Sequence, residues 1–389
     1  MKILRVISSM NPISGGPCQG IRNSIPHLQK MGTVNDVVCL DNEDDFYGVD
    51  DNFTIFKLGK GITSYQYSSK LLKWLEKNIV NYDAVIVHGI WQYPNYAVYK
   101  VIKSLNKQKK IVPKVIVMPH GMLDPYFQKD ASRKWKAKRN EIVWELTEKR
   151  AINAADAMFF TCEEELLLAR TTFDGYHPRK EINVGYGIQN PPEKTEQQQL
   201  AFQAILPTFD SSYWLYLSRI HPKKGIDLLI KSYISLCSSN VDVPDLVIAG
   251  PVDSEYAKEM IDLAQNNSKI HFTGMLKGDA KWGAMYGCEA YLLPSHQENF
   301  GIAIVEAMAC RKPVLVTQQV NIWREIKASD SGWILETSTA NNIEKILKII
   351  LQTNTAVLKE KGQNAFNNFE GKFTIAERAM TFASIIKSV

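Results

Sequence analysis

Apolar and polar residues alternate along this chain in a strand-then-helix rhythm. Short apolar runs that end in Gly, Pro, Asn or another polar residue indicate buried strands of a parallel sheet. The amphipathic stretches between them indicate helices, so we expect an α/β fold with doubly wound parallel sheets. The predicted strands are residues 2–8, 36–40, 84–88, 114–118, 156–161, 182–185, 212–217, 245–250, 271–276, 290–293, 314–317 and 332–335. The predicted helices are residues 20–31, 93–105, 128–153, 226–236, 302–309, 342–351, 357–369 and 373–386.

Chain length and one polar stretch divide this rhythm into two halves. A chain of 389 residues exceeds one typical hydrophobic core, so two domains are expected. The composition turns polar at residues 193–199, directly after Pro191 and Pro192, which makes this stretch the best domain boundary. We therefore predict one domain at 1–190 and a second at 191–370.

The polar turn between strand 290–293 and the helix after Gly301 is the first candidate site. In open parallel sheets, small molecules bind at the carboxyl ends of the strands, and the first N–H groups of a helix can receive a phosphate. Glu298 precedes this helix and Glu306 lies within it, and carboxylates accept hydrogen bonds from sugar hydroxyls. The alternative is a surface turn with two solvated acids.

A second candidate site follows strand 212–217. Arg219 and Lys224 are spaced by five residues across a turn that precedes a helix, so both side chains can contact one diphosphate. The alternative is a solvated basic turn. Gly250 ends a further strand, at a point where the backbone either passes close to a ligand or turns tightly.

The first half of the chain offers a glycine loop and a histidine. Gly15 and Gly16 follow the first strand, where they form either a plain tight turn or a loop whose N–H groups approach a diphosphate or an acceptor. His120 follows strand 114–118 after Pro119, at the same sheet edge, although a lone histidine is often structural. Asp41 imitates the ribose-binding acid of a dinucleotide fold, but the loop at Gly15 lacks G-x-G-x-x-G.

Several of these residues also carry a family resemblance, namely Ser295, Glu298, Phe300-Gly301 and Glu306-Ala307-Met308. They resemble the E-x7-E signature of the retaining nucleotide-sugar glycosyltransferases of family 4, the group 1 glycosyltransferases with the GT-B architecture. The segment from Arg219 to Gly225 is similar to the R-x4-K-G of the same family. One position departs from the family pattern, because Asn299 stands where the family usually has Gly.

The resemblance implies a fold and a set of roles. It implies two Rossmann-like domains facing a cleft, with the acceptor on the side of 1–190, the nucleotide sugar on 191–370, and a terminal helix in 371–389 that crosses back to the first domain. The implied catalytic residues are His120, Arg219, Lys224 and Glu298, of which Glu298 and His120 hold the sugar and the two cations hold the pyrophosphate. The implied donor-binding residues are Gly15, Gly16, Gly250, Met275, Leu276, Asn299, Phe300, Gly301, Ile302 and Glu306. Met275 and Leu276 are implied as contacts of the nucleobase, with ordinary core packing as the alternative, and Glu306 as the contact of the ribose.

The implied reaction is the retaining transfer of a hexose onto a saccharide or lipid-linked saccharide in surface polysaccharide biosynthesis. Glucose from UDP-glucose is the favoured donor, ahead of GDP-mannose and UDP-N-acetylglucosamine. In that family, same-face attack uses a phosphate oxygen of the donor as the base. No D-x-D lies in an obvious strand-end loop, whereas fixed cations are available for the leaving diphosphate, so we expect no metal and no other cofactor.

Composition sets limits on partners and location. The net charge of +5 is mild for this length and demands no nucleic acid. The six cysteines are widely spaced without a C-x-x-C pair, which favours a reducing compartment. The start has too short an apolar core for a signal peptide, and no run reaches the length of a membrane span, so we expect a cytoplasmic protein. Peripheral contact with the inner face of the membrane stays open, although the basic stretch 129–139 is more simply a solvated helix face.

Two other interpretations stay open. A nicotinamide-dependent dehydrogenase is suggested by Gly15-Gly16 and Asp41. A nucleotide-sugar-binding protein without catalysis is the third, and the retained Glu298 and His120 argue against it.

Overall fold

The computed structural model describes residues 1–48, 51–130, 133–207, 209, 211–239 and 242–389. The chain divides into two compact units. The first consists of Met1–Gly187 together with Ile375–Val389, and the second of Ile188–Thr374. The sequence predicts these limits at 190 and 371, a few residues away.

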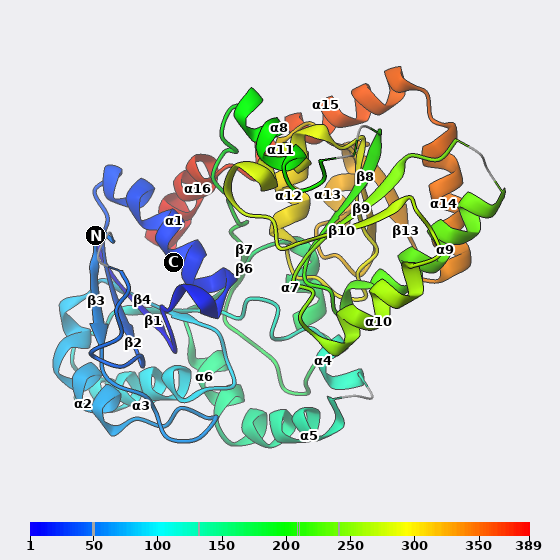
Figure 1. The fold of residues 1–389 in the computed structure, drawn as a ribbon. Coiled ribbons are helices and arrows are strands. Elements are labelled where there is room, and N and C mark those ends of the chain that lie inside the picture. Colours follow the sequence, from blue (N-terminus) through cyan, green and yellow to red (C-terminus); the bar gives the residue numbers. More distant parts are fainter. Residues whose placement is uncertain (49–50, 131–132, 208, 210, 240–241) are drawn as a thin grey trace. The chain divides into compact units, whose positions relative to one another are not determined.

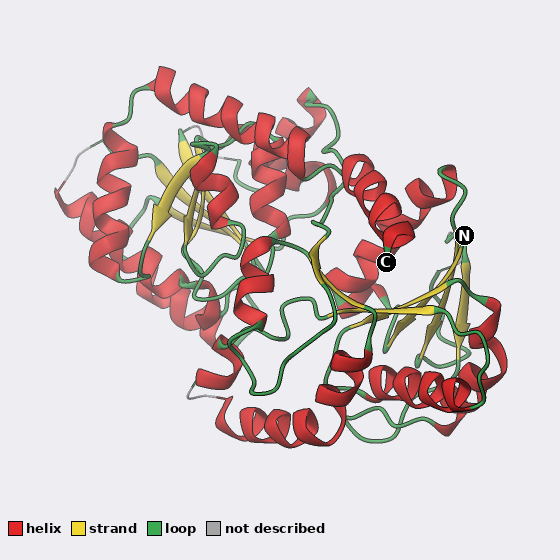
Figure 2. Ribbon diagram, turned by 180° about the vertical axis from the view of Figure 1, so that it is seen from behind, coloured by secondary structure: helices red, strands yellow, loops and turns green. Residues whose placement is uncertain are grey.

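The first unit is built on a seven-stranded parallel sheet with the order β3-β2-β1-β4-β5-β6-β7. Helices cover both faces of this sheet (Figures 1 and 2). The strands are β1 (Lys2–Ile7), β2 (Val34–Cys39), β3 (Thr54–Lys57), β4 (Ala84–His88), β5 (Lys114–Met118), β6 (Ala157–Phe160) and β7 (Glu181–Asn183). The α-helices are α1 (Gly16–Lys30), α2 (Ser69–Asn78), α3 (Tyr93–Lys107), α4 (Tyr126–Lys129), α5 (Lys134–Val143), α6 (Lys149–Ala154), α7 (Glu163–Ala169) and α16 (Ile375–Ser388).

The second unit repeats the plan with a six-stranded parallel sheet of order β10-β9-β8-β11-β12-β13. Its strands are β8 (Tyr213–Leu217), β9 (Asp245–Ala249), β10 (Ile270–Gly274), β11 (Ala290–Leu293), β12 (Val314–Thr317) and β13 (Gly332–Leu335). Its α-helices are α8 (Glu196–Gln203), α9 (Ile226–Ser239), α10 (Glu255–Ala264), α11 (Gly278–Gly287), α12 (Ile302–Ala309), α13 (Trp323–Ala328), α14 (Ala340–Gln352) and α15 (Thr355–Lys372). The α/β prediction of two Rossmann-like doubly wound sheets is confirmed.

The strand order fixes where ligands can bind. In the first sheet β1 pairs with β2 on one side and β4 on the other, and in the second β8 lies between β9 and β11. At such a switch point, the loops that follow the two central strands leave the sheet in opposite directions and open a crevice. In the second unit these are the loops after β8 and β11, which contain the predicted cations and the predicted glutamate.

The last helix belongs to the first unit, although it follows the second in the chain. The apolar side of α16, with Ala379, Phe382 and Ala383, packs in one buried cluster with Ile86 and Phe159 of the sheet. The rings of Phe159 and Phe382 meet edge to face, with centroids 5.7 Å apart. Burying a large apolar side chain contributes about 1.5–3 kcal/mol, so this cluster holds α16 firmly.

Several local predictions were wrong or incomplete. The helices α2, α7, α8, α10, α11 and α13 were not predicted. The helix predicted at 128–153 is interrupted after α4, because Asp130 has an extended backbone, and a π-helical segment at Trp144–Glu148 then joins α5 to α6 and buries Trp144 and Glu148. Residues 131–132 of that stretch lie outside the described residues. The break predicted at 370–372 lies instead after Lys372, since α15 runs through Gly371. β3 was not predicted, because its four residues are only partly buried and show no clear alternation.

Within the described part of the chain, no helix has both the length and the apolar character needed to cross a membrane.

Candidate functional site

The loops after β8 and β11 are held together by hydrogen bonds to one carbonyl. The backbone N–H of His296 donates to the carbonyl oxygen of Lys223 at 2.8 Å. The hydroxyl of Ser295 donates to the same oxygen at 3.0 Å. Thr317, at the end of β12, donates its hydroxyl to the carbonyl of Ser295 at 2.6 Å. The turn that begins at Pro294 is therefore fixed from both neighbouring strands.

Gly225 allows the closest approach between these loops. It has a φ of +67°, and a Cβ placed on it would lie 2.2 Å from the carbonyl oxygen of Pro294. A side chain at this position meets both a strained backbone and a backbone oxygen that cannot rotate away. The glycine after Lys224 is thus a requirement of loop packing.

Lys224 and Glu298 are in direct contact at this point. The Lys224 ammonium donates to Oε2 of Glu298, and the two side chains are only 9% and 19% exposed. Burial of the ammonium, and then the positive charges of Lys223 and Arg219, lower the pKa of Lys224 to about 7. The backbone of Glu298 is fixed on both sides, because its N–H donates to Gln319 O and its carbonyl accepts from Asn321 N, each at 2.9 Å.

Arg219 lies on the same loop but faces solvent. Its side chain is exposed, while its carbonyl oxygen accepts a 3.0 Å hydrogen bond from the Tyr216 hydroxyl. Its charge nevertheless lowers the pKa of Lys224, so the two cations lie close enough to interact. The structure therefore brings Arg219, Lys224 and Glu298 to one switch point.

The helix after this turn starts at a glycine in the left-handed region. Gly301, with φ of +77°, is the N-cap of α12, and the side chain of Ile302 is partly exposed beside it. The first N–H groups of such a helix have no partner within the helix and can receive an anion. Phe300 is buried and meets Phe373 edge to face at 5.7 Å.

Asn299, the departure from the family pattern, fits without strain. It is not among the positive-φ residues of the described chain, and its side-chain oxygen accepts a 3.3 Å hydrogen bond from Nδ2 of Asn321. The left-handed conformation of this turn lies at Gly301 instead. The extra side chain therefore leaves the turn intact.

Glu306 has a partner that sequence reasoning missed. Nζ of Lys281, on α11, donates to Oε1 of Glu306 at 2.6 Å, and the two side chains are 21% and 16% exposed. The ammonium also lies over the ring of Trp282, 4.3 Å from its centroid. Lys281 belongs to no motif, so only its position in space identifies it.

The remaining predicted donor-binding residues of this unit differ in how exposed they are. A Cβ on Gly250 would lie 2.1 Å from the carbonyl oxygen of Ser218, so this glycine serves close packing of the loops after β8 and β9. Leu276 is buried and Met275 is 55% exposed, which leaves Met275 accessible to a ligand. Both directly follow Gly274 at the end of β10.

His120, Gly15 and Gly16 lie in the first unit. Gly15 has φ of +93° with open space around it, and Gly16 is the first residue of α1. His120 follows β5, with φ of +52°. Asp41 is engaged within the unit, because its Oδ2 accepts from Met10 N at 2.7 Å and from the Tyr47 hydroxyl. A carboxylate so engaged is a structural group, which weakens its role as a ribose-binding acid.

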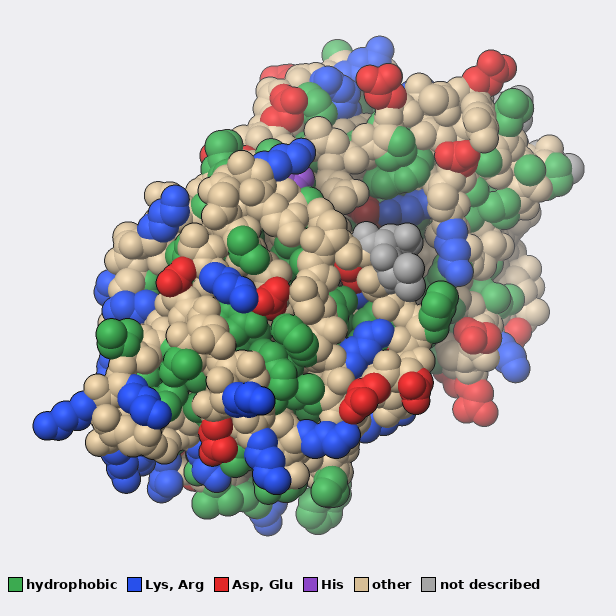
Figure 3. Space-filling model, turned by 90° about the vertical axis from the view of Figure 1, so that its left-hand side faces the viewer, with side chains coloured by type: hydrophobic (Ala, Val, Ile, Leu, Met, Phe, Trp, Pro, Cys, Tyr) green, Lys and Arg blue, Asp and Glu red, His purple; other side chains and the backbone are tan. Residues whose placement is uncertain are grey.

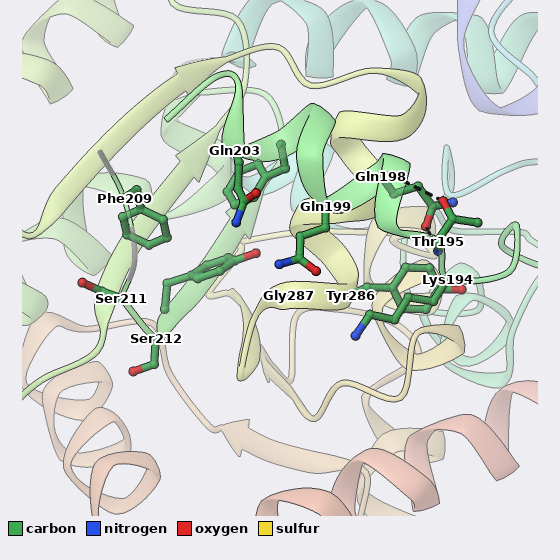
Figure 4. A pocket seen from close by; sticks show the side chains of 13 residues that line it. Lys194, Thr195, Gln198, Gln199, Gln203, Phe209, Ser211, Ser212, Tyr286 and Gly287 are labelled. Atoms are coloured by element: carbon green, nitrogen blue, oxygen red, sulfur yellow. Dashed lines mark hydrogen bonds between the residues drawn. The ribbon is translucent and has the colours of Figure 1, made fainter. Parts of the chain in front are cut away.

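One pocket of the second unit contains none of the predicted site residues. It has a volume of about 440 Å³ and lies between α8, α11 and the segment before β8, with Gln198, Gln199 and Tyr286 among its lining residues (Figure 4). In the described residues, no cluster of three or more His, Cys, Asp and Glu side chains is arranged to hold a metal ion.

Part of the second unit matches a known family. Residues 198–367 match the family model described as "Glycosyl transferases group 1". An uncharacterized glycosyltransferase of Methanocaldococcus jannaschii is 29% identical over 168 residues, which are 42% of this chain and 45% of that protein. The capsular polysaccharide biosynthesis glycosyltransferase CapM of Staphylococcus aureus is 30% identical over 164 residues, 41% of each protein. The chain spans less than half the length of these curated relatives.

Solved structures share the fold over the whole chain. Anabaena HepE, solved in complex with UDP and glucose, has a TM-score of 0.75 at 16% identity and covers 100% of both chains. A glycosyltransferase from Rickettsia africae has a TM-score of 0.76 at 15% identity, over 100% of this chain and 98% of that one. The comparisons give no support to the dehydrogenase alternative. The chain therefore has the two Rossmann-like units of the GT-B glycosyltransferases, and its residues 198–367 are similar in sequence to the group 1 glycosyl transferases.

Proposed function

We propose that this chain is a retaining glycosyltransferase of family 4 that moves a hexose from a nucleotide sugar to a saccharide or lipid-linked saccharide, without a metal ion. UDP-glucose is the proposed donor. The proposal rests on one observation, the contact between Lys224 and Glu298 at the switch point of the second sheet, beside Arg219 and the start of α12. Cations for a diphosphate and a carboxylate for a sugar hydroxyl thus meet at the crevice where ligands of such sheets bind.

The chemistry assigned to these residues follows from charge. Breaking the bond between the sugar and the diphosphate places negative charge on the diphosphate and positive charge on the anomeric carbon. Arg219, Lys224 and the first amides of α12 stabilise the diphosphate, an interaction of a few kcal/mol for each well-placed donor. Glu298 accepts hydrogen bonds from the hexose, and Glu306 from the ribose.

His120 and the glycine loop serve the same reaction from the first unit in this proposal. His120 donates a hydrogen bond to the hexose, and Gly15 and Gly16 provide backbone N–H groups. Met275 provides a contact for the uracil base.

A pocket of the first unit suits the acceptor. It has a volume of about 380 Å³ and lies at the carboxyl ends of β1, β2 and β4. Its polar lining residues include Ser8, Ser9, Lys60, Gln66 and Gln92. Hydroxyl and amide groups both donate and accept hydrogen bonds, as the hydroxyls of a saccharide require.

Peripheral contact with an anionic membrane is part of the proposal for a lipid-linked acceptor. Trp135 and Ile142 are 85% and 54% exposed on the basic helix α5, and Leu146 is 61% exposed on the π-helical segment that follows. Lysine and arginine side chains near a membrane surface are attracted to anionic lipids, and exposed apolar side chains beside them can enter the interface. Figure 3 also shows Lys and Arg side chains gathered on the lower part of one face of the molecule. Sedimentation with vesicles of anionic lipid, but not with neutral ones, is the expected result.

The choice of donor and pathway is supported by the relatives. HepE was solved with UDP and glucose, and CapM is named for capsular polysaccharide biosynthesis. UDP-glucose and surface polysaccharide are therefore the first donor and pathway to test, ahead of GDP-mannose and UDP-N-acetylglucosamine.

A thermal-shift panel followed by a transfer assay tests the proposal. A donor at a hundred times its Kd should stabilise the protein by about 2.7 kcal/mol, so UDP-glucose should raise Tm more than GDP-mannose or NADH. Transfer from labelled UDP-glucose to a saccharide acceptor should give a product with the anomeric configuration of the donor. Lys224→Met should abolish the shift, whereas Lys231→Met, which removes an exposed cation of α9, should not. A shift with NADH alone would refute the assignment.

A further inference from the structure

A buried arginine lies at one end of a hydrogen-bonded row in the first unit. Arg5, in the middle of β1, is only 3% exposed, and no salt bridge joins it to a carboxylate among the described residues. Its Nε donates to Oδ1 of Asn35 at 3.0 Å, and its guanidinium carbon lies 5.3 Å from the centroid of the Phe382 ring. A buried charge is costly without hydrogen bonds and a compensating contact, so these partners hold Arg5 in place.

The row continues through two histidines. Nη1 of Arg5 lies 3.2 Å from Nε2 of His88, and Nδ1 of His88 lies 2.9 Å from Nε2 of His120. The two imidazole planes differ by 15° and their centroids are 5.2 Å apart. The centroid distance exceeds the N···N distance by about two ring radii, so the rings lie edge to edge in nearly one plane, as a linear hydrogen bond requires.

The donor in each bond follows from the arginine. A guanidinium has only donors, so Nε2 of His88 must accept. Burial is the main cause that lowers the pKa of His88 well below its ordinary value and that of His120 to about 4, and the charge of Arg5 lowers both further. Each ring therefore carries one proton at neutral pH. His88 holds it on Nδ1 and donates it to Nε2 of His120, which leaves the proton of His120 on Nδ1.

The backbone behind His120 is fixed as well. Gly121 donates its N–H to Oε1 of the buried Glu165 at 2.5 Å, and the same carboxylate accepts from the N–H and the hydroxyl of Thr161 at 2.8 and 2.6 Å. The hydrogen bonds to Glu165, together with the left-handed conformation of His120, fix the backbone atoms from which the His120 side chain projects. The row from Arg5 then sets which nitrogen is protonated.

We propose that Arg5 and His88 are positioning residues that hold the proton of His120 on Nδ1, so that His120 presents an N–H donor to a hydroxyl oxygen of the sugar. The role in sugar binding rests on the proposed function, whereas the position of the proton does not. The ligand group that such a donor recognises is an oxygen with a free lone pair, not an ammonium group or another cation.

Nitrogen NMR of histidine tests the proton position directly. The chain has seven histidines, so the His120 signals are assigned by their loss in His120→Asn. In the wild-type protein at pH 7, long-range ¹H–¹⁵N spectra should show a protonated Nδ1 and an unprotonated Nε2 for His120. A protonated Nε2, or a mixture of the two forms, overturns the proposal.

A matched pair of variants at His88 distinguishes a role in positioning the His120 proton from a merely structural role. In His88→Gln, the amide oxygen can accept from Arg5 and the amide N–H can donate to His120, so the tautomer and kcat/KM should stay within about threefold of wild type. In His88→Met both bonds are lost, so His120 should show mixed tautomers and kcat/KM should fall by about tenfold or more. Arg5→Met should give the same mixture of tautomers. If one of the Met variants does not fold, the other still decides the outcome.

The outcomes distinguish this inference from the proposed function. An unchanged tautomer in every one of these Met variants that folds overturns it, even if transfer activity falls. A wild-type protein with the expected tautomer but no transfer from any nucleotide sugar supports the row and refutes the function. Equal loss of kcat/KM in His88→Gln and His88→Met, with the tautomer kept in both, assigns His88 a merely structural role and overturns the proposal.

Discussion

The contact between the two site loops depends on Gly225, so Gly225→Ala should destabilise the second unit and separate Lys224 from Glu298. A Cβ at this position lies 2.2 Å from the carbonyl oxygen of Pro294. Backbone atoms approach so closely only where no side chain intervenes. The loop after β8 must therefore move away from the turn at Pro294 to make room.

The magnitude has two parts. A non-glycine residue in the left-handed region costs about 1–2 kcal/mol, and Gly225 has φ of +67°. Overpacking of a tightly packed site typically costs a further ~1–3 kcal/mol, because the atom in the way is a backbone oxygen. The free energy of unfolding should therefore fall by about 2–5 kcal/mol, which corresponds to a Tm lower by roughly 5–15 °C for a unit of this size.

Calorimetry of the variant and of a matched control measures this loss. Gly371 lies inside α15 of the same unit, and a Cβ placed on it meets no atom within 4 Å. Gly371→Ala should therefore raise stability by about 0.5–1 kcal/mol, because alanine favours the helix. A Tm of Gly225→Ala within 1–2 °C of wild type would show that the loops do not need the close approach, and the reasoning would fail.

Three further predictions concern the reaction itself. Glu298→Gln should lower turnover by a factor of ten or more, a loss of at least about 1.4 kcal/mol, measured as initial rates with saturating donor; unchanged turnover removes Glu298 from the site. Transfer should survive excess EDTA, and a loss that Mg²⁺ restores would contradict the metal-free mechanism. The pKa of Lys224 is about 7, and a bound diphosphate raises it, so binding takes up a proton. By isothermal titration, the Kd for UDP-glucose should rise up to about fivefold from pH 7 to 8, because about half of Lys224 is already neutral at pH 7, but it should stay flat in Lys224→Arg.

Much of the fold follows from apolar patterning alone. The strand at Ala290–Leu293 is an uninterrupted apolar run. It forms a central strand that is buried on both faces, which is the structure that such a run predicts. The edge strand at Thr54–Lys57 is the opposite case. It is half-exposed and short, and nothing in its four residues distinguishes it from a loop.

Long-range effects explain the other errors. The stretch 128–153 has the composition of one helix, but its π-helical turn is set by burial of Trp144 against Phe173 and Tyr176, far along the chain. Likewise, the single glycine at 371 suggests a bend, yet α15 continues through it because the surroundings leave room for a regular helix. Propensity is a weak guide where tertiary packing decides.

The sequence predicted the parts of the candidate site that lie within single turns, but not the contacts between turns. The turn that carries Glu298 and the turn that carries Lys224 are each readable in the sequence, but their contact, 74 residues apart, is a property of the strand order. The ion pair between Lys281 and Glu306 was not predicted, because the two residues lie on different helices. The sequence does not show which charged residues lie next to each other in the folded chain.

In the proposed function, those pairs would add a ligand selectivity that the number of charges alone does not show. Each glutamate of the E-x7-E motif holds a lysine from another element, Lys224 for Glu298 and Lys281 for Glu306. Pairing offsets the cost of keeping these carboxylates mostly out of water, so removal of one partner leaves an uncompensated charge behind. An ammonium has three N–H groups and can hold a carboxylate and a phosphate oxygen together. In the proposed function, a nucleotide sugar would place a hydroxyl and a phosphate oxygen at the pair of Lys224 and Glu298, whereas a bare diphosphate would contact only the lysine.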